Sequence, residues 1–337
     1  MNDICFWPHV RNMAIASFRL RCDRVVEELR NERFSISFFD DASVPDKLVI
    51  SKRYDSRTID TALELREKHG TKIYLDICDN HFYFEGDDSA AINRAAELKV
   101  AVASVDALIV SSHYLGEIAR QEVPEVKRIE VIEDFIELEP VASYRHYLRH
   151  PILFAGCKTL SRSLDGVGKD KRFRMIWFGN HGSKFVDGGM ADLLSIRDVL
   201  EELSSRFPVS LTVVSNSEEK YRALISNWSV PTFYRPWNRH TFPVIAALHN
   251  VSVIPIVFNP FTLAKTSNRV STSLINGLKV VADPIPSYKE YEDRVLFSEW
   301  SDNLIAAIGD DRKPLMTKQE ISERNKKVLM SWKGILA

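Results

Sequence analysis

The sequence predicts an α/β protein of about two domains, each built on a parallel sheet with helices on both faces. Short apolar runs typical of buried strands alternate with longer segments whose apolar residues recur at helical spacing. This alternation favours parallel strands joined by helical crossovers. A chain of 337 residues is long enough for about two domains, each with its own core.

In the first half of the chain, strands and helices alternate in order. Ile15, Phe18, Cys22, Val25 and Leu29 recur on one face and predict the first helix. Strands are expected at residues 3–7, 47–51, 72–77, 108–110 and 128–132, and helices at 15–29, 59–68, 90–98 and 113–120.

The second half repeats the alternation after a proline-containing junction at 137–151. The polar, glycine-containing stretch 155–170 fits a flexible insertion and is assigned to no element. Strands are expected at 173–178, 210–214, 232–234, 251–256 and 279–283, and helices at 190–206, 218–225, 242–249, 270–275 and 317–336.

Composition and charge restrict the classes of function. The chain has 45% hydrophobic and 27% charged residues, which are ordinary globular values. A formal net charge of −1 argues against nucleic acid as a general partner, because such proteins need a basic surface. No apolar run approaches the ~18–20 residues needed to span a bilayer, and no signal-peptide pattern opens the chain. We therefore expect a cytoplasmic protein, with peripheral contact at the inner face of the membrane still allowed.

The cysteines show no metal or redox spacing. Cys5, Cys22, Cys78 and Cys157 include no C-x-x-C pair, and three of them lie in apolar runs. Buried thiols in a reducing compartment are expected.

The segment 261–291 is the most informative part of the chain, and it reads FTLAKTSNRVSTSLINGLKVVADPIPSYKEY. A polar loop opens a helix that Gly277 ends, and a short apolar strand follows. The first N–H groups of a helix are unpaired and carry partial positive charge, so they suit a phosphate. Lys265 and Arg269 add full charges there. The alternative is an ordinary helix start with solvated basic side chains.

This segment resembles the C-terminal-domain signature of bacterial GT-B-fold glycosyltransferases, in the variety with a K-x-x-N-R loop. The stretches 176–183 (IWFGNHGS), 233–237 (FYRPW) with 251–256 (VSVIPI), and 131–134 (VIED) resemble other parts of that family in the same order. Together these matches span most of the chain. The resemblance implies two Rossmann-like, doubly wound parallel-sheet domains facing across a cleft.

The resemblance also implies a domain plan and a chemistry. It places an acceptor-binding domain at 1–145, a nucleotide-sugar-binding domain at 146–316, and a helix at 317–337 that crosses back to the first domain. In such enzymes negative charge grows on the departing phosphate, and fixed positive groups stabilise it. Lys265 is the expected catalytic cation, with Thr266, Ser267, Asn268 and Arg269 contributing donor contacts. Arg269 could instead pair with an acidic neighbour. No metal or other cofactor is expected.

Other donor contacts are expected where strands end, because ligands of open parallel sheets bind beyond the carboxyl ends of the strands. Small residues in such a loop let backbone N–H groups approach a phosphate. Ordinary turns and a core tryptophan are the alternatives. The candidates are Gly179, Asn180, His181, Gly182 and Asn216. The resemblance adds Arg235 and Trp237, whose stretch stands where the family binds a nucleobase.

The first domain is expected to supply acceptor contacts and a general base. Asp79 and His81 follow a predicted strand and could remove a proton from an acceptor hydroxyl. Arg11 and Arg19 could meet an anionic acceptor. The alternatives are a capping aspartate, a partly exposed histidine and a solvated helix start. Asp134 resembles an acidic residue near the cleft, or forms a structural salt bridge.

The chain departs from the family in one respect. Many retaining members carry two glutamates whose positions correspond here to Ala264 and Thr272, and neither residue is a carboxylate. The stereochemical outcome therefore stays open.

The predicted function is transfer of a sugar from a nucleotide-sugar to a glycan or lipid-linked saccharide, in bacterial surface polysaccharide biosynthesis. A catalytically silent nucleotide-binding scaffold and a sugar-nucleotide epimerase on the same fold are the alternatives. A scaffold predicts nucleotide binding without turnover. An epimerase predicts release of free nucleotide without modification of an acceptor.

Overall fold

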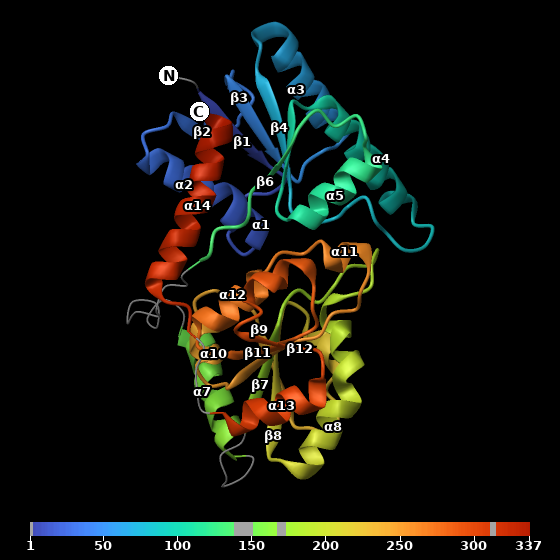
Figure 1. Cartoon of the computed structure of the whole chain (residues 1–337), viewed down its shortest axis with the longest axis vertical. Coiled ribbons are helices and arrows are strands. Elements are labelled where there is room, and N and C mark those ends of the chain that lie inside the picture. Colours follow the sequence, from blue (N-terminus) through green and yellow to red (C-terminus); the bar gives the residue numbers. More distant parts are fainter. Residues whose placement is uncertain (1–2, 138–150, 167–172, 311–314) are drawn as a thin grey trace. The chain divides into compact units, whose positions relative to one another are not determined.

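The computed structural model describes residues 3–137, 151–166, 173–310 and 315–337, which form two compact units (Figure 1). Unit 1 comprises Met1–Ile136, Leu263–Thr266 and Lys318–Ala337, and unit 2 comprises Glu137–Thr262 and Ser267–Thr317. The predicted boundary between residues 145 and 146 lies outside the described residues.

Unit 1 is built on a six-stranded parallel sheet with the strand order β2-β1-β3-β4-β5-β6. The five strands predicted for this half are all present, and the short β2 was missed. The strands are β1 (Ile4–Pro8), β2 (Ile36–Phe38), β3 (Lys47–Ser51), β4 (Lys72–Ile77), β5 (Ala107–Val110) and β6 (Ile129–Val131). Burial on both faces explains why residues 48–50 of β3 and all of β5 are apolar rather than alternating.

Helices cover both faces of this sheet (Figure 1). One layer consists of α3 (Ser56–His69), α4 (Ser89–Ser104) and α5 (His113–Glu122). The other consists of α1 (Ala16–Phe18), the π-helical turn η1 (Arg19–Asp23), α2 (Arg24–Asn31) and α14 (Lys318–Leu336). Side-chain caps begin the first layer: Asp55, Asp88 and Ser112 accept N–H groups from the first turns of α3, α4 and α5.

Unit 2 has a second six-stranded parallel sheet, with the order β12-β11-β10-β7-β8-β9. Its strands are β7 (Phe173–Phe178), β8 (Val209–Ser215), β9 (Thr232–Pro236), β10 (Val251–Ile254), β11 (Lys279–Ala282) and β12 (Val295–Phe297). The sequence predicted all of them except β12, an edge strand of three residues.

Helices again cover both faces. One face packs against η2 (Gly189–Ile196, a 3-10 helix), α8 (Arg197–Arg206), α9 (Glu218–Leu224) and α13 (Trp300–Gly309). The other packs against α7 (Pro151–Gly166) and α10 (Phe242–Ala246). The connections after β10 and β11 hold α11 (Pro260–Leu263), α12 (Asn268–Ile275) and the 3-10 helix η3 (Pro286–Tyr291).

The stretch predicted as a flexible insertion is largely the helix α7, so that expectation was wrong. Phe154, Cys157, Leu160 and Leu164 recur at helical spacing and are buried. This apolar stripe was readable in the sequence, but the glycines and serines between its members obscured it. Residues 167–170 of the stretch lie outside the described residues.

Both sheets contain a topological switch point, where consecutive connections leave in opposite directions along the sheet. Counted within unit 2, the strand order is 3-2-1-4-5-6, and the switch lies between β7 and β10. In unit 1 the order begins 2-1-3-4, and the switch lies between β1 and β3. Ligands of doubly wound sheets bind at the carboxyl ends of the strands that flank such a point.

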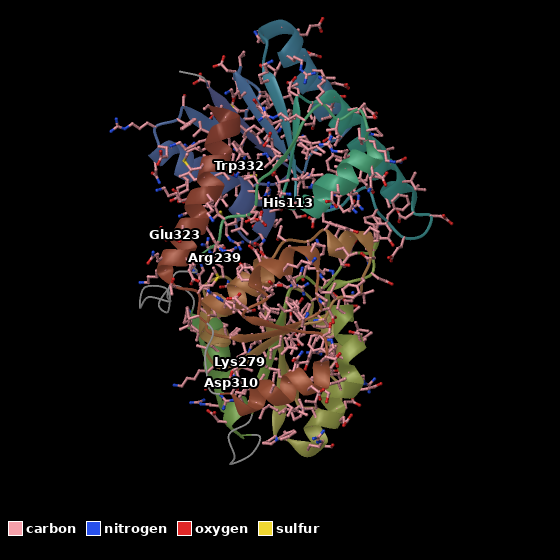
Figure 2. All side chains as sticks on the ribbon, viewed as in Figure 1. His113, Arg239, Lys279, Asp310, Glu323 and Trp332 are labelled. Atoms are coloured by element: carbon pink, nitrogen blue, oxygen red, sulfur yellow. The ribbon has the colours of Figure 1, made fainter. Side chains whose placement is uncertain are left out.

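The terminal helix α14 packs against the sheet of unit 1, where Trp332 is its main anchor (Figure 2). The Trp332 side chain is 1% exposed, and its ring centroid lies 5.6 Å from that of Phe6 in β1. Asn325 adds polar contacts, since its amide accepts the Ile136 N–H at 2.7 Å and donates to the Ile136 carbonyl at 2.9 Å. The helix thereby covers a sheet face that α1 and α2 leave incomplete.

Replacing Trp332 with alanine is expected to lower the free energy of unfolding by about 3–5 kcal/mol, because it leaves a large cavity. Denaturant unfolding measures this loss. Met330 on the same helix is 56% exposed, so Met330→Ala is the matched control and should change stability by less than about 0.5 kcal/mol. Equal effects of the two substitutions would contradict this packing.

Candidate functional site

A buried ionic network holds together the carboxyl-end edge of the sheet in unit 1. Arg21, which is 1% exposed, bonds the Asp76 carboxylate through Nε at 2.9 Å and Nη2 at 2.5 Å. Its Nη1 donates to Asp134 at 2.8 Å and to the Ile132 carbonyl at 2.8 Å. Asp134 therefore forms a structural salt bridge, which was one of the two expectations for it. The other Asp76 oxygen accepts the Ser51 hydroxyl at 2.8 Å.

The same network fixes the backbone of Lys52. The Lys52 N–H donates to the Asp76 carbonyl at 2.9 Å, directly after β3 ends. Lys52 has φ +52°, a left-handed conformation that costs a residue other than glycine ~1–2 kcal/mol. The hydrogen bond to the Asp76 carbonyl and the ion pair with Asp79 help to offset this strain.

The Asp79 carboxylate is held between two lysines, Lys52 and Lys265. Lys52 bonds one carboxylate oxygen and Lys265 the other. Burial opposes ionisation of Asp79, but the charges of Lys265 and Lys52 outweigh it and hold the pKa of the carboxyl well below its usual range. Burial also acts against the Lys52 charge, yet Asp79 raises the pKa of Lys52 above its ordinary value. Lys52 therefore stays cationic at neutral pH.

His81 and Tyr54 complete what we call the Asp79 cluster (Lys52, Tyr54, Asp79, His81 and Lys265). The Tyr54 hydroxyl lies 2.5 Å from Nδ1 of His81. Burial lowers the pKa of His81 to about 3, although the Asp79 charge opposes this shift. His81 is therefore neutral at physiological pH and has a ring nitrogen able to accept a proton.

The position of Lys265 depends on the segment Leu263–Thr266, which packs within unit 1. The Ser112 hydroxyl donates to the Ala264 carbonyl at 3.0 Å, and the Ala264 side chain is 1% exposed in the main core of the unit. A buried alanine with a bonded carbonyl fixes the backbone one residue before Lys265. Ala264 stands at one of the family's glutamate positions, so the cluster has no carboxylate there.

The two predicted acceptor residues have partners within unit 1. Arg11 donates to the Phe39 carbonyl at 2.7 Å and lies 4.9 Å from the centroid of the Phe38 ring. Arg19 is buried, and its guanidinium donates to the Met13 carbonyl at 2.9 Å. Their role as acceptor contacts stays a prediction.

In unit 2, the predicted donor loop follows β7 at the switch point. The Asn180 side chain accepts the Gly182 N–H at 3.0 Å. Asn216, which follows β8, accepts the His181 N–H at 2.9 Å, and the same oxygen lies 2.9 Å from Nδ1 of His181. The Ser215 hydroxyl donates to the Gly179 carbonyl at 2.8 Å. The structure thus brings the predicted 179–182 loop and Asn216 together.

Glycine is needed in this loop because two of its backbone segments touch. Gly182 has φ +116°, and a Cβ there would lie 2.6 Å from the Gly188 carbonyl oxygen. Gly189 has φ +78°, and a Cβ there would lie 2.6 Å from the backbone of Gly182. We call residues 179–189 the glycine loop. Its glycines allow the two backbone segments to pack directly against each other.

Arg269 lies beside the glycine loop and is not fully solvated. A Cβ on Gly179 would be 3.9 Å from Cδ of Arg269. Burial raises the pKa of Asp192 and of Tyr288, and in both cases the charge of Arg269 opposes the shift. Asp192 accepts the Gly189 N–H at 3.0 Å and the Val257 N–H at 3.3 Å. The acidic neighbour expected as an alternative partner of Arg269 is therefore present.

The remaining predicted donor residues lie on separate elements. Ser267 precedes α12, and its hydroxyl donates to Glu290 at 2.6 Å. Asn268 is the first residue of α12, and Thr266 belongs to unit 1. Trp237 follows the end of β9, and its backbone N–H donates to the Ser215 carbonyl at 2.9 Å. Arg235 lies within that strand.

The sequence analysis missed two residues of these sites. Lys52 is the first residue after a correctly predicted strand, so the rule that selected Asp79 would also have selected it. Asp192 lies inside a predicted helix, and nothing in its spacing indicated that it would bond two separate loops. Only the tertiary contacts identify it.

Comparison with known proteins supports the fold. No protein-family model and no curated protein sequence matches the chain. Sucrose-phosphate synthase from Thermosynechococcus elongatus has a similar structure, with a TM-score of 0.52 and 12% identity over 93% of this chain and 75% of that one. TarM is also similar, with a TM-score of 0.51 and 12% identity over 91% of this chain and 54% of TarM. Both are glycosyltransferases of the GT-B fold, so the predicted fold of two Rossmann-like domains is confirmed.

The buried neutral His81 should make stability depend on pH. Its pKa is about 3 when folded and near the ordinary 6.5 when unfolded, so the unfolded chain binds more protons between these values. The free energy of unfolding should therefore fall as the pH drops from 7 to 4.5, by at most about 2–3 kcal/mol from this residue.

Denaturant unfolding across this pH range should show a shallower dependence for His81→Asn than for the wild type. His113 is exposed at the start of α5, so His113→Asn is the control and should keep the wild-type slope. An unchanged slope in His81→Asn would show that His81 is protonated normally in the folded protein.

Proposed function

We propose that the chain transfers a glycosyl group from a nucleotide-sugar to a glycan or lipid-linked saccharide. The observation that carries this proposal is the Asp79 cluster, which unites Lys265 with Asp79, Lys52 and His81 at the carboxyl ends of β3 and β4. Ligands of parallel sheets bind at this edge, and such convergent charged groups are typical of active sites. The fold, shared with glycosyltransferases of two Rossmann-like domains, supports the same activity.

The nucleotide is proposed to bind unit 2 at the switch point between β7 and β10. The glycine loop follows β7 and has no side chains at Gly179 and Gly182, and Asn216 fixes the turn at His181. Arg269 adds positive charge beside Gly179. Arg235 and Trp237, near the end of β9, are proposed to lie toward the nucleobase.

Lys265 is proposed to stabilise the negative charge that develops on the departing phosphate. In the sequence it stands three residues before Asn268, the first residue of α12. An ammonium held in place by a carboxylate needs little reorganisation during the reaction. With this charge supplied by the chain, we propose that transfer proceeds without a divalent cation.

Asp79 is proposed to position Lys265 rather than to remove a proton. A carboxylate whose pKa lies well below its usual range is a poor base at neutral pH. His81, which is neutral and bonded to Tyr54, stays the proposed contact for the acceptor hydroxyl, but its pKa of about 3 makes it a weak base at neutral pH as well. Neither assignment determines whether the configuration at the sugar is retained or inverted, because Ala264 and Thr272 carry no carboxylate.

The cellular setting is proposed to be bacterial surface polysaccharide synthesis at the inner face of the membrane. None of the helices in the described residues is long and apolar enough to cross a membrane. The acceptor is proposed to reach the enzyme in the cytoplasm or from the membrane surface.

Thermal unfolding with UDP, GDP, dTDP, ADP and CMP tests the donor assignment. At least one nucleotide should raise the Tm, since a ligand at 100 times its Kd stabilises the folded state by about 2.7 kcal/mol. No shift with any nucleotide would contradict the proposal. Binding without turnover on any acceptor would instead indicate a scaffold, and free nucleotide with no modified acceptor would indicate an epimerase.

Once a donor is found, Lys265→Ala should lower kcat by about 10²–10³-fold, because one fixed charge at the leaving group is lost. Initial rates of the two proteins measure this loss. For each protein the rate should be the same with and without EDTA, because no divalent cation is proposed to take part. Lys326, which is exposed on α14, provides the control substitution Lys326→Ala and should keep the wild-type rate. A Lys265→Ala enzyme with unchanged kcat would remove Lys265 from the mechanism.

A further inference from the structure

A cavity of about 210 Å³ lies at the switch point of unit 1, and Lys52 is the member of the Asp79 cluster that lines it. Pro8 at the end of β1 and Ser51 at the end of β3 both line it, and these two residues are paired in the sheet. The cavity therefore occupies the position where doubly wound sheets bind ligands. Its volume is below the ~300 Å³ of a whole drug-sized site, so it would hold one part of a larger molecule.

The walls of the cavity are mostly apolar. Val10, Ile15, Phe18 and Cys22 line it, and Phe18 and Cys22 are buried. Val10 and Ile15 are each 38% exposed, so apolar side chains continue from the interior to the surface of the 9–16 loop. Met13 on the same loop is 39% exposed and extends this apolar surface. Such a lining favours a hydrocarbon group over a sugar.

The polar lining of the cavity contains one cation, Lys52, beside His9, Ser17 and Ser51, and no carboxylate lines it among the described residues. An ammonium group has three N–H donors. The bond from Lys52 to Asp79 uses one of them, which leaves donors for an anion in the cavity. Charge complementarity therefore indicates a negatively charged ligand.

We infer that this cavity binds the phosphate of a lipid phosphate acceptor together with the first part of its hydrocarbon chain. The inference rests on the proposed function and names its acceptor class: a saccharide joined through phosphate to an aliphatic lipid. Lys52 then contacts both the acceptor phosphate and Asp79, which in turn holds Lys265. Binding of this acceptor is thus linked through one lysine to the proposed catalytic cation.

Calorimetric titration with octyl phosphate, octyl glucoside and inorganic phosphate, each below any micelle concentration, tests this inference. Octyl phosphate should bind at least about tenfold more tightly than either other probe, because it alone supplies both the charge and the chain. Equal binding of inorganic phosphate would mean a simple anion site. Equal binding of octyl glucoside would mean an apolar site, and either result overturns the inference.

Two variants locate the binding. Ser17→Phe places a ring in the cavity, and Lys52→Met removes its charge; each should weaken octyl phosphate binding at least about tenfold. Lys72 is exposed at the other end of the sheet, so Lys72→Met should bind as the wild type does. Lys52→Met also removes a partner of Asp79, so Ser17→Phe is the decisive variant. If Ser17→Phe binds octyl phosphate as tightly as the wild type does, the inference is overturned.

Nucleotide protection measured on the same proteins separates this inference from the proposed function. If nucleotides protect the wild type and Ser17→Phe equally while only the wild type binds octyl phosphate, the cavity is the lipid phosphate site. If no nucleotide protects the wild type but octyl phosphate binds with the expected variant effects, the donor assignment fails and the lipid phosphate site stands.

Discussion

The buried carboxylate of Asp76 is the contact on which the candidate site in unit 1 depends. It pairs with Arg21 from η1 and accepts the Ser51 hydroxyl, while the carbonyl of the same residue fixes the backbone of Lys52. Removing one partner of such a pair leaves an uncompensated buried charge, which typically costs several kcal/mol. The network therefore favours one arrangement of the carboxyl-end edge, and it supports the left-handed conformation of Lys52.

The charges of Lys52 and Lys265 lower the pKa of Asp79, whereas burial raises it. Burial alone would favour the protonated acid, but two ammonium groups keep it ionised. The result is a carboxylate that serves as an anchor for cations, in a chain that lacks the paired glutamates of related folds. His81 stays neutral beside Tyr54, because burial lowers its pKa to about 3.

Most of the fold was predictable because local signals agreed with it. Residues 48–50 of β3 and all of β5 are apolar, as is typical of buried parallel strands, and capping residues such as Asp55 and Ser112 mark where helices begin. The missed strands β2 and β12 are three residues long, too short for a periodic pattern. The helix α7 was missed although its apolar stripe was present, because its small polar residues resembled those of a loop.

The sequence by itself determined the alternating elements, the two-sheet α/β fold, and the loops at strand ends that hold Asp79, His81 and the glycines 179 and 182. These follow from local periodicity and from the general rule that ligands bind beyond the carboxyl ends of parallel strands. Only the tertiary structure decided that Arg21 is a buried structural cation, that Asp79 is shared by two lysines, and that Asp192 joins separate loops. Such roles depend on contacts between residues far apart in the chain, and neither spacing nor composition encodes which charges will meet.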